Sequence, residues 1–144
     1  MKTPFTLVLV EDDEGHARLI GRNLQRVGVL NPLVRLKNGA EALDYFLAGA
    51  ASAHSHSVVV LDLNLPDIDG FEILRRLKSD PASADVPVIV LTTTDHPSDI
   101  DRCYALGCNG FMTKPVHHND FAEAIRKLGL SLTTVRVPHF RDKS

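Results

Sequence analysis

The chain has 144 residues, of which 44% are hydrophobic and 24% charged, and this is the composition of an ordinary globular protein. The length accommodates one domain of common size and little else. Sixteen Lys and Arg against eighteen Asp and Glu give a net charge of −2. Because no broad basic surface results, we expect no nucleic-acid partner.

The sequence also lacks the features of membrane and secreted proteins. Its longest apolar runs have the length of strands and fall far short of the roughly 20 residues that a membrane span requires. Cys103 and Cys108 follow no zinc or redox spacing, and the chain begins without a signal-peptide pattern. We therefore expect a cytoplasmic protein with reduced thiols and no membrane partner.

Five short apolar runs predict β-strands. Several are continuous rather than alternating, which is typical of strands buried on both faces of a parallel sheet. The runs are Phe5–Val10, Leu33–Leu36, Val58–Leu61, Val86–Leu91 and Gly110–Met112.

Amphipathic stretches of helical length follow these runs. Three have apolar residues at helical spacing, which places each stripe on one helix face. The stripes are Ala17, Ile20, Leu24 and Val27; Phe71, Leu74 and Leu77; and Phe121, Ile125 and Leu128. Weaker patterns predict helices over Gly39–Ala50 and Ser98–Leu106. Ser98 is the expected N-cap of the latter, and Gly107 is its expected terminator.

Strands and helices thus alternate, which predicts a doubly wound α/β fold with helices on both faces of a five-stranded parallel sheet. In such sheets, function collects at the carboxyl ends of the strands. The residues that close each apolar run are therefore the first candidates for a site.

Four carboxylates, in the segment V-E-D-D-E, close the first run. Clustered carboxylates repel one another unless a cation or a lysine neutralises them. An acidic turn that opens the next helix would also be favourable, because it complements the helix dipole. This motif alone leaves both interpretations open.

Asp62 comes directly after the third run, which is apolar enough to be a central strand. A carboxylate there is costly to desolvate unless it is paired. Asp67 and Asp69, flanked by Pro66 and Gly70, instead indicate turn and helix-capping residues.

Thr92 closes the fourth run, although hydroxyls are common in turns and this signal is weak alone. Lys114 closes the fifth run and precedes Pro115, a bond that can be cis in a tight turn. Carboxylates, a hydroxyl and an ammonium gathered at one sheet edge suit a hard cation such as Mg²⁺ together with a phosphoryl group.

These segments closely resemble the receiver domain of two-component response regulators. The resemblance extends from about Phe5 to about Leu128 and rests on L-V-L-V-E-D-D, V-V-V-L-D-L-N-L-P-D-I-D-G-F-E-I-L-R-R-L-K, V-P-V-I-V-L-T-T-T and A-L-G-C-N-G-F-M-T-K-P-V. It implies a flavodoxin-like fold with strand order 2-1-3-4-5. We expect a receiver domain over residues 1–129 and a C-terminal extension over residues 130–144.

The resemblance also implies a set of site residues. Asp62 would be the phosphoacceptor, and Asp12 would bind Mg²⁺ directly. Glu11, where relatives often have aspartate, would act on the metal mostly through water, and Asn64 would contribute its backbone carbonyl. Mg²⁺ is thus the expected cofactor.

Two further residues are implied in phosphoryl recognition and one in switching. Thr92 would hydrogen-bond a phosphoryl oxygen, and Lys114 would pair with the phosphoryl group or with the unphosphorylated acceptor. On phosphorylation, Thr92 would move inward and Phe111 would fill the vacated space. Phe111 lacks the hydroxyl that many relatives have at this position. The responding face would comprise the fourth helix, the fifth strand and the fifth helix.

The resemblance predicts a single-domain response regulator that a sensor histidine kinase phosphorylates and that signals through protein contacts. Self-phosphorylation and self-dephosphorylation are expected, without turnover of a separate substrate. A docking regulator and a phosphate shuttle in a multi-step phosphorelay remain alternatives for its output.

The C-terminal extension is apolar and β-branched at Leu132, Val135 and Val137, and Pro138 closes this run. It resembles the extensions of stand-alone regulators that are paired with bacterial phytochromes. This implies a bacteriophytochrome among the candidate kinases. It also implies a homodimer through the fourth helix, fifth strand, fifth helix and extension.

Other classes fit the sequence less well. A haloacid-dehalogenase-type phosphatase has D-x-D after its first strand, whereas Asp62 follows the third and precedes Leu63 and Asn64. A receiver that no longer takes phosphate conflicts with the intact Asp62, Thr92 and Lys114. A nucleotide-binding protein is disfavoured because none of the glycines forms G-x-G-x-x-G or a Walker loop.

The histidines suggest a second hypothesis, a transition-metal site, which the sequence disfavours. His54 and His56 lie in a loop of small residues, and His117 and His118 open a helix. A transition-metal site requires three or four convergent ligands, and neither pair indicates such a set.

Overall fold

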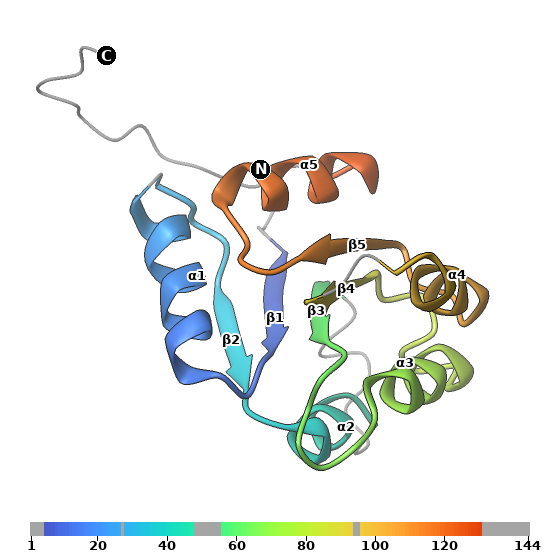
Figure 1. Ribbon diagram of the computed structural model, residues 1–144. Coiled ribbons are helices and arrows are strands. Elements are labelled where there is room, and N and C mark those ends of the chain that lie inside the picture. Colours follow the sequence, from blue (N-terminus) through green and yellow to red (C-terminus); the bar gives the residue numbers. More distant parts are fainter. Residues whose placement is uncertain (1–4, 27, 48–55, 94–95, 131–144) are drawn as a thin grey trace, which may run out of the picture.

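The computed structural model describes residues 5–26, 28–47, 56–93 and 96–130, and its strands and helices alternate strictly along the chain (Figure 1). Five parallel strands form one sheet in the order β2-β1-β3-β4-β5. The strands are β1 (Thr6–Val10), β2 (Leu33–Leu36), β3 (Ser57–Asp62), β4 (Val88–Thr92) and β5 (Gly110–Thr113). The predicted fold class and strand order are confirmed.

Helices cover both faces of this sheet. They are α1 (Glu14–Arg26), α2 (Gly39–Leu47), α3 (Gly70–Ser79), α4 (Pro97–Ala105) and α5 (His118–Lys127). Helices α1 and α5 lie on one side, and α2, α3 and α4 lie on the other (Figure 1). None of the described helices has both the length and the apolar character needed to cross a membrane.

The central strand shows why the apolar runs are continuous. Val58 and Val60 of β3 pack into the core beside α1 and α5, whereas Val59 and Leu61 pack into the core on the other face. All four side chains are at most 1% exposed. Because successive strand residues point to opposite faces, a strand covered on both sides must be apolar at every position.

Strands β3, β4 and β5 each extend one residue beyond the predicted apolar run. Asp62 pairs with Leu91 in the ladder, and Thr92 pairs with Thr113. The ladder joins backbone groups and tolerates a polar side chain at its end, which an apolar pattern does not reveal. The polar residues of the site are therefore held by strand backbone. At the amino ends, β1 begins at Thr6 and β4 at Val88, later than predicted.

Helix α4 differs from the prediction at its start. It begins at Pro97, so His96 is its N-cap and Ser98 lies in the first turn; the predicted Ser98 cap is wrong. Proline suits the first helical position because its N–H would lack a partner there. At the other end, Gly107 has φ +103° and its N–H donates to the carbonyl of Tyr104, so the predicted terminator is confirmed.

The two cysteines are buried and carry no disulfide. Burial raises the pKa of Cys103 to about 11 and also raises the pKa of Cys108. Both side chains are therefore neutral thiols near pH 7. Several residues of the sequence analysis lie outside the described residues, namely Val27, Ala50, His54, Thr94 and the extension beyond Leu130.

The loop from β3 to α3 closes on itself at Gly70. The Gly70 N–H donates to the Leu63 carbonyl at 3.3 Å. A Cβ atom at Gly70 would overlap the backbone of Leu63. Backbone cannot move aside as a flexible side chain can, so this position admits only glycine without a shift of the loop.

We predict that Gly70→Ala lowers the free energy of unfolding by about 1–3 kcal/mol, the usual cost of overpacking. Gly21→Ala in α1 is the matched control, because its Cβ would meet only the Leu33 side chain at 3.5 Å. That control should raise stability by about 0.5–1 kcal/mol through helix propensity. Urea unfolding followed by circular dichroism measures both, and equal effects would contradict the close approach at Gly70.

Candidate functional site

Side chains from three strand ends converge at the carboxyl edge of the sheet. Glu11 and Asp12 follow β1, Asp62 ends β3, and Lys114 follows β5. One carboxylate oxygen from each of the three acidic residues lies within 4.8 Å of the others. Glu11 and Asp62 are fully buried, whereas Asp12 is exposed. The structure therefore brings together the four charged residues selected from the sequence.

The Lys114 ammonium lies between the two buried carboxylates. Its Nζ donates to Asp62 Oδ2 at 2.9 Å and lies 3.1 and 3.2 Å from the two Glu11 oxygens. Burial lowers the pKa of Lys114, but its hydrogen bonds to Asp62 and Glu11 together outweigh this, and the pKa lies above its usual value. Lys114 is thus held as a cation at the centre of the site.

The Asp62 carboxylate is hydrogen-bonded at both oxygens and is still costly to ionise. Oδ1 accepts the Asn64 N–H at 2.9 Å, and Oδ2 accepts from Lys114. Burial raises the pKa of Asp62 to about 6, aided by nearby Glu11 and opposed by the bonds from Lys114 and Asn64. A buried carboxyl with a raised pKa at a strand end is a functional-site candidate on physical grounds.

Glu11 has the opposite balance although it is equally buried. Its Oε1 lies 2.7 Å from His16 Nδ1, and its Oε2 accepts the Asp13 N–H at 3.1 Å. Burial raises the pKa of Glu11, but hydrogen bonds, the largest from His16, bring it below the usual value. The two buried carboxyls thus titrate as an interacting pair in which Glu11 is the stronger acid.

Two supporting residues, Arg35 and His16, do not emerge from the sequence analysis. Arg35 of β2 donates from Nε and Nη2 to the Glu11 carbonyl at 3.1 and 2.9 Å, and from Nη2 to the Asp12 carbonyl at 3.2 Å. Its Nη1 also donates to Glu14 at 3.0 Å. Arg35 therefore fixes the acidic turn from the neighbouring strand. The available signal was a lone arginine in an otherwise apolar strand.

The loop after Asp62 is held by two helix caps. Asp69 accepts the Phe71 N–H at 2.9 Å and caps α3, as predicted. Asp67 accepts the N–H groups of Gly39 and Ala40 at 2.8 and 2.9 Å, so it caps α2. The loop beside Asp62 is consequently attached to both neighbouring helices.

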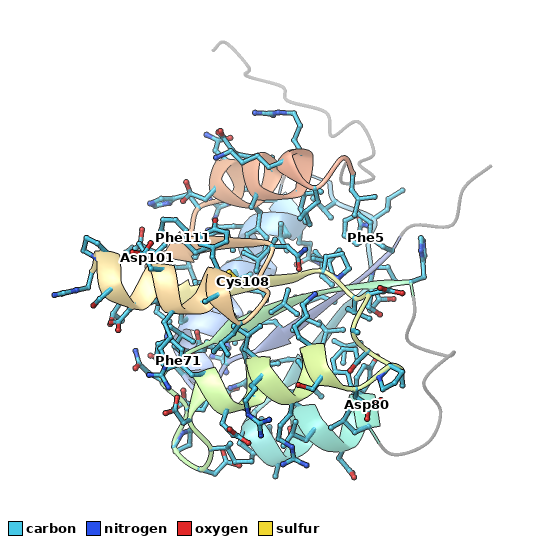
Figure 2. The ribbon with its side chains drawn as sticks, turned by 90° about the vertical axis from the view of Figure 1, so that its right-hand side faces the viewer. Phe5, Phe71, Asp80, Asp101, Cys108 and Phe111 are labelled. Carbon is cyan, nitrogen blue, oxygen red and sulfur yellow. The ribbon has the colours of Figure 1, made fainter. Side chains whose placement is uncertain are left out.

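The remaining sequence candidates lie on β4 and β5. Thr92 is buried, and its carbonyl accepts the Lys114 N–H at 2.8 Å. The partly buried Phe111 lies on β5 beside α4 (Figure 2), where its ring meets Tyr104 edge-on at 6.5 Å. Thr92 is thus adjacent to the charged cluster, whereas Phe111 lies nearer the start of β5 and packs against α4 through Tyr104.

No histidine of the part of the chain that the structure describes belongs to a group of potential metal ligands. Within the described residues, Glu11, Asp12 and Asp62 are the one group of three or more potential metal ligands. His117 is the N-cap of α5, and its N–H donates to Asp120 at 3.0 Å.

Comparison with known proteins places the chain in a family. A model of the response regulator receiver domain matches residues 7–126. The chain belongs to this family. Receiver domains are signalling domains that partner with histidine kinases, and they bind Mg²⁺ or Mn²⁺ at an acidic pocket. The predicted resemblance is confirmed.

Three receiver proteins illustrate the similarity. A receiver domain from Rhodospirillum rubrum is 42% identical, with a TM-score of 0.70 over 92% of this chain and 99% of that one. The bacteriophytochrome response regulator AtBRR is 34% identical, with a TM-score of 0.77 over 94% of this chain and all of its own, 100%. Response regulator Rcp1 of Synechocystis is 30% identical over 94% of each chain, and the TM-score of its structure is 0.71.

The site of this receiver domain suits a hard divalent cation. Three carboxylates supply oxygen ligands, which Mg²⁺ prefers, and their mutual repulsion disfavours the cluster in the absence of cations. Lys114 neutralises only part of this charge. The residues present therefore fit the metal that the family binds.

The raised pKa of Asp62 predicts a pH-dependent stability. The pKa is about 6 in the folded chain against an ordinary value of 3.8. Between these values the folded chain retains a proton that the unfolded chain has released, so stability falls as pH rises through this window. The full difference of two units corresponds to about 3 kcal/mol.

We predict that Asp62→Asn stabilises the metal-free protein by about 1–3 kcal/mol at pH 7.5, because the ionised carboxylate is replaced by a neutral amide. The gain should shrink toward pH 4. Urea unfolding at several pH values in the presence of a chelator measures it. Asp44→Asn, at an exposed position of α2, is the control. A gain that does not depend on pH would refute the assigned cause.

Proposed function

We propose that this protein is a single-domain response regulator that accepts a phosphoryl group on Asp62 from a sensor histidine kinase. The observation that carries the proposal is the Asp62 carboxylate itself. It is fully buried at the end of a central strand, lies 2.9 Å from the Lys114 ammonium, and shares a cluster with two further carboxylates. Membership of the receiver family supports the same function.

The proposed metal is Mg²⁺, held by Glu11, Asp12, Asp62 and the backbone carbonyl of Asn64. The Mn²⁺-bound form of its relative Rcp1 supports a divalent ion as the cofactor. When bound, the ion supplies positive charge beside the phosphoryl oxygens. Asp12 is the exposed member of the cluster, so the ion would enter the pocket from the side on which Asp12 lies.

The transfer step follows from the placement of Asp62. One of its carboxylate oxygens forms a bond to phosphorus as the P–N bond of the donor's phosphohistidine breaks, and the electron pair remains on the imidazole nitrogen. Lys114 and Thr92 stabilise charge on the phosphoryl oxygens. Hydrolysis of the resulting acyl phosphate returns the carboxylate, so the signal is transient. No separate substrate is turned over.

The proposed response lies on the face of α4, β5 and α5. Phe111 and Tyr104 belong to this face, and Tyr104 is 48% exposed. These residues line a cavity of about 260 Å³ that also includes Ala124 and Lys127 of α5. Phosphorylation would draw Thr92 inward and favour burial of Phe111. A partly open face that combines aromatic and charged side chains in this way suits a protein partner.

We further propose the partners of this receiver domain. Similarity to the bacteriophytochrome response regulator AtBRR supports a phytochrome-type histidine kinase, and the charge balance supports an output without nucleic acid. The receiver domain would span residues 1–129, with residues 130–144 as an extension that joins the α4–β5–α5 face in a homodimer. A phosphate shuttle or docking regulator is the alternative output.

The acceptor is tested directly with acetyl phosphate and Mg²⁺. We expect intact-mass spectrometry to show one added phosphoryl group that is stable to acid and labile to base. Asp62→Asn should remain unlabelled because the attacking oxygen is missing, whereas Asp44→Asn should label as wild type. Equal labelling of Asp62→Asn would show that another residue is the acceptor.

The dimer is tested by sedimentation velocity. We expect the full chain to sediment as a dimer, and a chain that ends at Gly129 to shift toward monomer because its apolar extension is lost. Tyr104→Ala in the full chain should weaken the dimer as well, whereas Gln25→Ala on α1 should not. Identical monomeric profiles for all four would refute the homodimer.

A further inference from the structure

His16 connects the acidic cluster to the loop that carries Lys114. It lies in the first turn of α1, and its side chain is 9% exposed. Nδ1 lies 2.7 Å from Glu11 Oε1, and Nε2 lies 3.4 Å from the backbone nitrogen of Val116. One ring thus bridges the end of β1 and the segment Lys114–Val116 that follows β5.

The two contacts together determine the tautomer of the ring. The backbone N–H of Val116 can only donate, so Nε2 must be the acceptor and carry no proton. The ionised Glu11 carboxylate can only accept, so Nδ1 must carry the proton. The neutral Nδ1–H form of His16 satisfies both partners at once.

We propose that His16 is a positioning residue, which orients the Glu11 carboxylate toward the metal pocket and attaches it to the Lys114 loop. The inference rests on the proposed function, because it concerns how the same pocket prepares for Mg²⁺. His16 makes no contact with the reacting carboxylate of Asp62 in the described structure; it acts through Glu11.

The position of Glu11 explains why such support is needed. Glutamate has one more rotatable bond than aspartate, so more side-chain entropy must be lost to hold its carboxylate in one place. Glu11 is fully buried, and Oε1 is held by His16 and Lys114. Without His16, Oε1 would lose its shorter contact and keep the longer one with Lys114, which Asp62 also engages. Hydrogen-bonded outer partners of metal-binding carboxylates typically contribute 10–100-fold in metal affinity.

The contact with Val116 extends the effect to the opposite strand end. Val116 is 1% exposed in the core beneath α1 and α5, two residues from Lys114. The Val116 contact therefore joins the α1 turn to the segment that places the ammonium. Glu11 and Lys114 keep a common geometry because the same imidazole contacts both sides.

Isothermal titration calorimetry of the full chain with Mg²⁺ at fixed pH tests the proposal. The variants are chosen to remove the contact of His16 with Glu11 and its contact with Val116 separately. The amide of His16→Asn can reach Glu11 but not Val116, whereas the longer amide of His16→Gln favours the Val116 side. We expect His16→Phe and His16→Gln to weaken Mg²⁺ binding about tenfold or more, and His16→Asn to remain within about threefold of wild type. Gln25→Ala, exposed on the same helix, is the control.

The outcomes separate this inference from the proposed function. If wild type binds Mg²⁺ and both His16→Asn and His16→Gln bind it as tightly as wild type does, His16 has no positioning role, although the pocket remains a metal site. Tighter binding by His16→Phe would also overturn it, because His16 would then compete with the ion. If wild type itself binds no Mg²⁺, the proposed function fails together with this inference. Circular dichroism verifies that each variant is folded.

Discussion

The site depends on one ammonium group that compensates two buried carboxylates. Asp62 and Glu11 are both fully buried, and Lys114 Nζ lies within 3.2 Å of both. An unpaired buried charge is strongly destabilising, so these three positions constrain one another. The compensation is incomplete, as the raised pKa of Asp62 shows. The pocket therefore retains an excess of negative charge, which a cation or a loss of charge on Asp62 would relieve.

Most of the supporting contacts hold the backbone segments that carry Glu11, Asp62 and Lys114. Arg35 draws the carbonyls of the acidic turn toward β2, and Asp67 attaches the loop after Asp62 to α2. The Lys114 N–H is bonded to the Thr92 carbonyl, which continues the β4–β5 ladder to the site. The charged side chains of the site thus extend from backbone that neighbouring strands and helices hold in place. Such preorganisation limits the reorganisation that the proposed phosphoryl transfer would otherwise require.

The sequence predicted the fold and the charged cluster because both follow from local patterns. Continuous apolar runs identify buried parallel strands, and parallel strands bring their carboxyl ends to one edge, which places Asp62 near Lys114. The support from Arg35 and His16 was not predicted. Arg35 meets Glu11 because β2 and β1 are in register, and His16 meets Val116 across 100 residues. Such contacts depend on tertiary geometry, which no local pattern encodes.

Helix α4 is connected to the site from two directions. The Arg102 guanidinium lies 4.0 Å from the centre of the Phe71 ring. Phe71 stands at the start of α3, directly after the loop that follows Asp62. Tyr104 meets Phe111, which precedes Lys114 by three residues on the β5 side. Figure 2 shows Phe71 and Phe111 on either side of α4. A cation–π contact at a surface contributes about 0.5–1 kcal/mol, and an aromatic pair contributes about 0.5–1.5 kcal/mol. Contacts of this size are weak enough to be exchanged under the proposed phosphorylation of the strand ends, so α4 is the element best placed to respond.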